Sequence, residues 1–72
     1  MSNTNILITI IENLRANKFA EAQQDCTLLP KCKETTQLYA TIGAIDGQPT
    51  EQSFKGTKSA AIALADSLIG RI

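Results

Sequence analysis

Apolar residues near the start of the chain recur at intervals of three and four positions, which is the period of an α-helix. We therefore predict a helix over residues 4–16. Its start can be capped by the polar residues 2–4. The β-branched run that begins at Ile8 would also suit a strand, but the helical pattern continues as far as Arg15 and favours the helix. The apolar face of this helix consists of Ile6, Leu7, Ile10, Ile11 and Leu14.

A second helix is predicted for residues 18–29. Asn17 suits the left-handed stop of the preceding helix, and Pro30 is expected to end the second one because proline cannot continue the helical hydrogen bonds. The segment from Asn17 to Ala22, followed by Pro30, resembles the turn and second helix of a tetratricopeptide unit. The resemblance covers about 14 residues and no second repeat follows, so it implies a helical hairpin and not membership of that family. The narrow apolar stripe of this helix is Phe19, Ala22, Cys26 and Leu29.

Residues 34–46 fit two structures. A helix is favoured by an apolar face and by the stop signal Asp-Gly-Gln-Pro that ends the segment. The alternative is an α+β fold with a β-hairpin in residues 36–55, because Asp46 and Gly47 suit a tight turn. Its second strand, residues 50–54, would contain a single apolar residue, whereas half-buried strands alternate apolar and polar residues. We therefore expect a helix, with a buried face made by Leu38, Ile42 and Ile45.

Residues 47–57 are predicted to form a polar loop, and residues 57–71 the last helix. Its body is rich in alanine, and at about 100° per residue its apolar arc spans about 160°, with Ile62 and Ile69 at the shoulder. The four segments together predict an all-α fold, a compact bundle of about four short helices in a single domain, residues 1–72. The apolar arc consists of Ala61, Leu64, Ala65, Leu68 and Ile72.

The small size of the chain raises the question of what stabilises it. A domain of 72 residues buries only roughly 60% of its unfolded surface, and such domains usually rely on disulfides, a metal or self-association. Cys26 and Cys32 could close a loop across Pro30, but two cysteines are too few for a disulfide scaffold, and two reduced thiols with Cys26 in the core are expected. The chain has no histidine and its acidic residues are scattered, so we expect no metal and no cofactor. Self-association remains as the expected support.

The helices carry more apolar surface than a core of this size can enclose. Ile8 projects between Glu12 and Arg15 on the polar side of the first helix, and Ile62 and Ile69 widen the apolar arc of the last. Scattered exposed aliphatic residues are common in soluble proteins. Here we expect these three isoleucines to form part of an interface with a second copy or with a protein partner.

Charge and hydropathy narrow the classes of partner and the location. Seven basic and seven acidic residues give a net charge of zero, which disfavours nucleic acid as a partner. The mostly apolar run over residues 6–11 is shorter than the about 20 residues of a membrane helix and lacks the positive start of a signal peptide. We therefore expect no contact with a membrane and a cytoplasmic location.

A second candidate site lies at the predicted start of the last helix. Free backbone N–H groups and the helix dipole favour anions at such a position, and two lysines with two hydroxyl groups strengthen the case. The spacing of a phosphate-binding P-loop is absent. The competing interpretation is simple helix capping by Thr57 or Ser59, with the lysines in solvent. The residues concerned are Lys55, Gly56, Thr57, Lys58 and Ser59.

No pattern of residues indicates catalysis. Without histidine, neither a Ser–His nor a Cys–His nucleophile pair can form, and the carboxylates show no paired spacing. We therefore predict a non-enzymatic protein–protein interaction module, such as an adaptor, regulator or inhibitor of the kind that phages and mobile elements encode. The alternative is a protein that binds a small anionic or phosphate-containing ligand at Lys55–Ser59.

Overall fold

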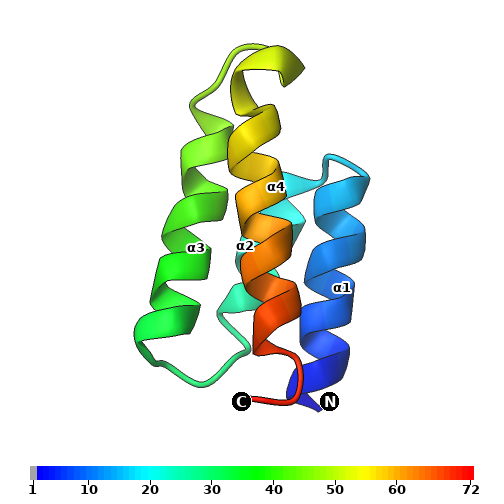
Figure 1. Cartoon of the computed structure of the whole chain (residues 1–72), viewed down its shortest axis with the longest axis vertical. Coiled ribbons are helices and arrows are strands. Elements are labelled where there is room, and N and C mark those ends of the chain that lie inside the picture. Colours follow the sequence, from blue (N-terminus) through cyan, green and yellow to red (C-terminus); the bar gives the residue numbers. More distant parts are fainter. Residues whose placement is uncertain (1) are drawn as a thin grey trace.

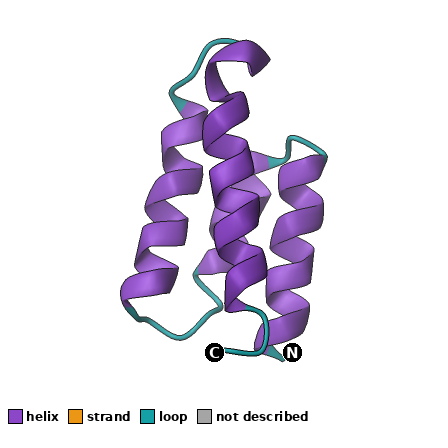
Figure 2. Cartoon of the chain, in the orientation of Figure 1, coloured by secondary structure: helices purple, strands orange, loops and turns teal. Residues whose placement is uncertain are grey.

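The computed structural model describes residues 2–72, and all the regular structure in that range is helical (Figure 2). The helices run alternately up and down, so the two ends of the chain lie at the same end of the bundle (Figure 1). The all-α prediction is confirmed, and the alternative with a hairpin in residues 36–55 is wrong. The helices are α1 (Asn3–Arg15), α2 (Phe19–Cys26), α3 (Lys33–Asp46) and α4 (Glu51–Leu68).

Each helix packs against two others, and the four form a closed ring in the order α1, α2, α3, α4. Within residues 2–72 the diagonal pairs α1/α3 and α2/α4 make no contact of comparable closeness. The pair α1/α4 and the pair α2/α3 therefore form two opposite sides of the bundle. These two sides carry the features described below.

Local hydrogen bonds explain where α1 begins and ends. The Ser2 hydroxyl accepts a hydrogen bond from the Asn5 N–H at 3.2 Å, which caps the first turn. At the other end Asn17 adopts a left-handed conformation with φ 61°, as the sequence predicts. The Lys18 N–H donates to the Asn13 carbonyl at 2.8 Å. This hydrogen bond is typical of a helix C-terminus that ends at a left-handed residue. The chain can therefore reverse into α2 within three residues.

The second helix is shorter than the sequence predicts. It ends at Cys26 and not at Leu29, because the N–H groups of the next three residues bond to carbonyls three positions back. The Thr27 hydroxyl also donates to the Gln24 carbonyl at 2.6 Å, which competes with continuation of the helix. Pro30 follows this turn and so does not itself end α2. The turn directs Leu29 into the core, where it is buried.

The fourth helix begins six residues earlier than predicted, at Glu51 instead of Thr57. Thr50 is its N-cap, and its hydroxyl accepts a hydrogen bond from the Ser53 N–H at 3.3 Å. The polar loop predicted for residues 47–57 is therefore wrong beyond residue 50. Gly56 is accommodated inside the helix, in open space where an added Cβ would meet nothing within 4 Å.

The core lies along the axis of the ring and contains the apolar faces predicted for α1 and α3. Cys26 is buried with them, and it and Cys32 are free thiols, as predicted. The small side chains Ala61 and Ala65 are fully buried on α4, which lets that helix approach its neighbours closely. At the upper end Phe19 and Phe54 meet edge to face at 5.0 Å between ring centroids and join α2 to α4. The buried apolar residues are Ile6, Leu7, Ile10, Ile11, Leu14, Ala22, Cys26, Leu29, Leu38, Ile42, Ile45, Ala61, Ala65 and Leu68.

Candidate functional site

The edge of α4 that carries Ile62 borders α1. The Lys58 ammonium group donates a hydrogen bond of 2.7 Å to the Asn17 side-chain oxygen at the end of α1. Ile62 lies one turn after Lys58, so it shares this edge of the helix. Ile69 is the C-cap residue directly after α4 and has an extended backbone. Both isoleucines are partly buried and pack against the core.

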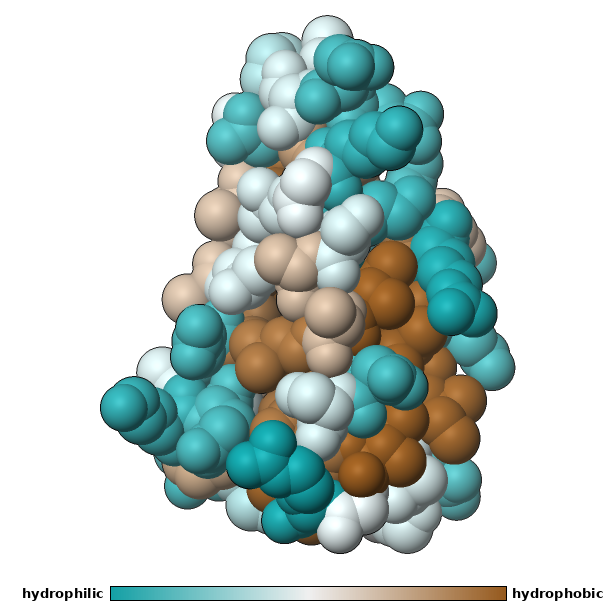
Figure 3. Space-filling view, in the orientation of Figure 1, coloured by the Kyte–Doolittle hydropathy of each residue, from teal (hydrophilic) through white to brown (hydrophobic). Residues whose placement is uncertain are grey.

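Ile8 lies on the exposed side of α1. The edge of α1 that borders α2 is fixed by Asn13, whose side-chain amide donates to the Asp25 carboxylate of α2 at 2.9 Å. Ile8 is about 140° around the helix from Asn13 at 100° per residue, so it points away from α2. Its side chain is 42% exposed. Figure 3 shows hydrophobic side chains gathered over α1 and the neighbouring edge of α4.

The three isoleucines predicted from the sequence therefore lie on one side of the bundle. We call Ile8, Ile62 and Ile69 the isoleucine face. Its surroundings carry charges of both signs: Glu12 lies one turn after Ile8, and Asp66 one turn after Ile62. Both carboxylates are exposed, and cations border the same side at the upper end of α1 and on α4. The face thus combines an apolar centre with a mixed, solvated rim.

The residues Lys55–Ser59 do not stand at a helix start. They lie in the second and third turns of α4, where backbone N–H groups bond to carbonyls four residues back, so the reason for expecting an anion there is wrong. Their side chains also spread around the helix, because consecutive positions differ by about 100°. Lys58 turns toward Asn17, whereas Lys55 and Ser59 are exposed. The structure does not gather them into one site, and anion binding by them remains a prediction.

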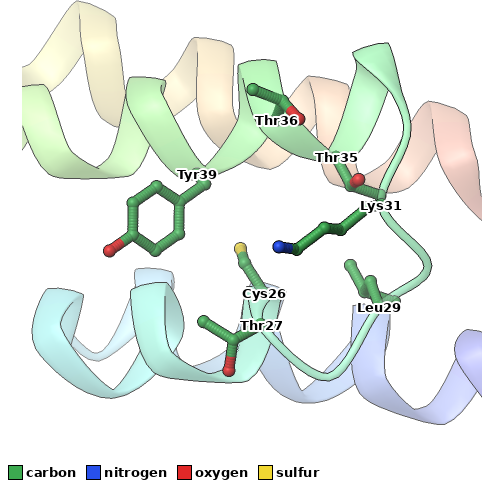
Figure 4. A pocket seen from close by; sticks show the side chains of 7 residues that line it. All are labelled: Cys26, Thr27, Leu29, Lys31, Thr35, Thr36 and Tyr39. Atoms are coloured by element: carbon green, nitrogen blue, oxygen red, sulfur yellow. The ribbon is translucent and has the colours of Figure 1, made fainter.

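A pocket that the sequence did not indicate opens between α2 and α3. Its volume is about 370 Å³. In Figure 4 the Cys26 thiol points from α2 toward α3, and the Lys31 side chain extends beside it from the connecting segment. The Tyr39 ring lies on the other side of that thiol and comes from α3. The lining residues are Cys26, Thr27, Leu29, Lys31, Thr35, Thr36 and Tyr39.

The electrostatics of this pocket are simple. Burial, with a smaller contribution from the neighbouring Asp25 carboxylate, raises the pKa of the Cys26 thiol to about 11, so the thiol is neutral at pH 7 and a weak nucleophile. Lys31 is the single charged residue among the seven that line the pocket. The Thr35 hydroxyl is already engaged, since it donates to the Pro30 carbonyl at 2.7 Å and accepts from the Cys32 N–H.

The first turn of α3 lies next to this pocket and holds its own carboxylate in place. The Glu34 pKa is lowered by a hydrogen bond from its own backbone N–H and by one from the Cys32 side chain. The Cys32 sulfur lies 3.5 Å from the Thr35 hydroxyl, so this thiol belongs to the cap of α3. Neither Cys32 nor Glu34 lines the pocket.

Within residues 2–72 no three side chains of the types His, Cys, Asp and Glu come together in a way that could hold a metal ion. In the same part of the chain, no helix has both the length and the apolar character needed to cross a membrane. Comparisons with known protein families, with curated proteins and with solved structures found no match. The site geometry is therefore the basis for the function proposed below.

Proposed function

We propose that the protein is a non-enzymatic protein–protein interaction module and that the isoleucine face is its contact surface. The observation that carries this proposal is the position of Ile8, a large aliphatic side chain left 42% exposed on the side that also presents Ile62 and Ile69. Burial of apolar surface is the main driving force of protein association, and an apolar centre inside a polar rim is the usual anatomy of an interface. An adaptor, a regulator and an inhibitor all act through such a surface. A cytoplasmic location is part of the proposal and suits two free cysteines.

The occupant that fits this face best is a second copy of the chain. The rim carries both carboxylates and cations, so a two-fold arrangement can place opposite charges against each other. The net charge of zero leaves little long-range repulsion between copies. Three isoleucines cover less than the roughly 800 Å² that each partner of a stable complex buries. We therefore expect a weak dimer in the micromolar range.

Sedimentation velocity over a concentration series tests this proposal. The wild type is expected to shift from monomer to dimer between about 10 µM and 1 mM. Ile8→Asp and Ile62→Asp each place a charge in the centre of the contact and are expected to keep the protein monomeric at the highest concentration. Circular dichroism checks that each variant remains helical.

The matched control is Leu28→Asp. Leu28 is the most exposed of the large apolar residues, at 61%, and lies in the turn after α2, away from the isoleucine face. This variant is expected to dimerise like the wild type. A wild type that stays monomeric at about 1 mM would overturn the second copy as the occupant. Equal loss of dimer in Leu28→Asp and Ile8→Asp would overturn the isoleucine face as the contact surface.

A further inference from the structure

The pocket between α2 and α3 has the size of a small-molecule site. Its volume of about 370 Å³ falls near the lower end of the range of roughly 300–1,000 Å³ that is typical of ligand pockets. A single ring or a short aliphatic chain fits such a space, whereas a nucleotide needs more. The pocket lies on the side of the bundle opposite the isoleucine face, so its occupation would be independent of the protein contact proposed there.

The charge within this pocket favours an anion. Lys31 supplies the one formal charge among the lining residues, and none of them is acidic. The two nearest carboxylates along the chain do not line the pocket: Asp25 accepts from Asn13 of α1 but lies close enough to Cys26 to raise the pKa of its thiol, and Glu34 is held by its own backbone and Cys32. The Cys26 thiol is protonated at neutral pH and adds no negative charge. A bound carboxylate would therefore meet a lysine without a competing anion in the pocket.

The remaining walls favour an apolar body attached to that anion. Cys26 and Leu29 are each only 5% exposed and supply a small apolar floor. The Tyr39 ring is 45% exposed and lies beside the Cys26 thiol (Figure 4), so a flat or aliphatic group can cover one of its faces. The Thr36 side chain also lines the pocket, and its hydroxyl can donate a hydrogen bond to a carboxylate.

We propose that the α2/α3 pocket binds a small organic carboxylate, with its charge at Lys31 and its apolar body between Leu29 and the Tyr39 ring. Binding covers apolar surface that the bundle leaves exposed and pairs the ligand carboxylate with the exposed Lys31 ammonium at the pocket rim. Both parts of the ligand are needed, because each half of the site alone offers a weak contact. The ligand class is thus a monocarboxylic acid with one aromatic ring or a short alkyl chain.

Amide chemical-shift titrations of the full chain test this proposal with defined probes. Benzoate and hexanoate are expected to cause saturable shifts of amides in residues 26–39 at millimolar concentration, while amides around Ile62 stay unchanged. Benzyl alcohol keeps the ring without the charge, and acetate keeps the charge without the apolar body. Both are expected to bind at least about tenfold more weakly. Equal affinities for acetate and benzoate would mean that only the lysine charge attracts the ligand, without specificity, and would overturn the proposal.

Two lysine variants provide the matched pair. Lys31→Met keeps most of the apolar stem and removes the charge, and it is expected to weaken benzoate binding at least about tenfold. Lys33→Met makes the same change on a second exposed lysine, which does not line the pocket, and is expected to leave the affinity within about twofold. Equal losses in both variants, or no saturable shift with either acid, would overturn the proposal. Dimerisation of the wild type is unaffected by these outcomes, so the two proposals fail separately.

Discussion

The two opposite sides of the bundle treat apolar residues differently. On the α1/α4 side, large isoleucines outnumber the positions that the core can enclose, and three of them reach the surface. On the α2/α3 side, α2 has only eight residues and a narrow stripe of apolar side chains. These two helices leave a pocket between them and no excess of apolar side chains on the outside. One side therefore offers an exposed apolar contact suited to protein, and the other a concave space suited to a small molecule.

The difference follows from helix length and side-chain size. An eight-residue helix presents about two turns, which is too little to cover the first half of α3 completely. By contrast, α1 and α4 are longer, with 13 and 18 residues, and Ala61 and Ala65 of α4 are both fully buried. The larger Ile62 is only partly buried at the edge of α4, and Ile69 follows as its C-cap residue. A small bundle can thus hold two distinct binding surfaces without any change in fold class.

Leu7→Ala and Ile8→Ala should separate core from surface on the α1/α4 side and give the largest contrast. Leu7 is fully buried, and its truncation is expected to cost about 2–5 kcal/mol because a cavity remains. Ile8 is the next residue and is 42% exposed, so its truncation is expected to cost less than about 1 kcal/mol. Urea denaturation at a low concentration, where the monomer prevails, measures both. Similar losses would mean that Ile8 belongs to the core.

The free energy of unfolding at alkaline pH tests whether Cys26, in the floor of the α2/α3 pocket, is shielded from water. The folded state raises the pKa of the Cys26 thiol from 9.0 to about 11, so it holds this proton more tightly than the unfolded chain does. The stabilising contribution is therefore present below pH 9 and is lost as the pH rises toward 11, on the order of 2 kcal/mol.

Cys26→Ala is the reference for this pH dependence. It removes only the buried thiol and keeps every other side chain of the protein. The free energy of unfolding is expected to fall less steeply between pH 9 and 11 in this variant than in the wild type. Parallel curves for the two proteins would contradict a desolvated Cys26.

Thr50→Ala tests the helix that borders both α1 and α3. Thr50 caps α4 through the Ser53 N–H, and loss of that cap is expected to lower the free energy of unfolding by about 1 kcal/mol. Ser59→Ala removes a hydroxyl in the helix body and is expected to be neutral or slightly stabilising, because alanine has the highest helix propensity. Thermal denaturation distinguishes the two. A larger loss of stability in Ser59→Ala than in Thr50→Ala would mean that the helix begins near residue 57, as predicted from the sequence.

Gly43→Ala is expected to have the smallest effect and tests how closely α2 and α3 are packed. An added Cβ would lie 2.6 Å from the Gln23 side-chain nitrogen, which is the flexible end of a side chain. Gln23 makes only a long hydrogen bond, 3.4 Å, to the Tyr39 carbonyl. The higher helix propensity of alanine offsets the loss of this hydrogen bond. Stability is therefore expected to change by less than about 0.5 kcal/mol. A loss above about 2 kcal/mol would mean that Gln23 cannot move.

The four helices could be predicted because the apolar period is a local property of the sequence. The predicted faces of α1 and α3 are buried as expected, and the left-handed Asn17 follows from a residue preference. The early start of α4 was also encoded, in a threonine cap with Ser53 three residues later and Glu51 in the first turn. The sequence-based prediction placed the helix start later because Pro49 and Gly56 are typical of loops. One exposed glycine, however, costs a helix only about 1 kcal/mol.

The pocket could not be predicted from the sequence. Its lining combines the end of α2, a connecting segment and α3, and Lys31 has no local pattern that separates it from other exposed lysines. The position of the isoleucine face could be predicted from the sequence only in part. Helical periodicity puts Ile8 and Ile62 at the margins of their own helices, but it does not show that α1 and α4 are neighbours in the ring.

The unequal lengths of the helices also have a consequence for the motion of the bundle. The upper turns of α4 extend beyond α2 (Figure 1), where Phe54 is only partly buried and Gly56 has open space around it. A segment with little buried apolar surface opens at a lower free energy than the core does. Amide hydrogens of residues 54–57 should therefore exchange with deuterium by local opening, and those of residues 61–68 only by unfolding of the whole bundle.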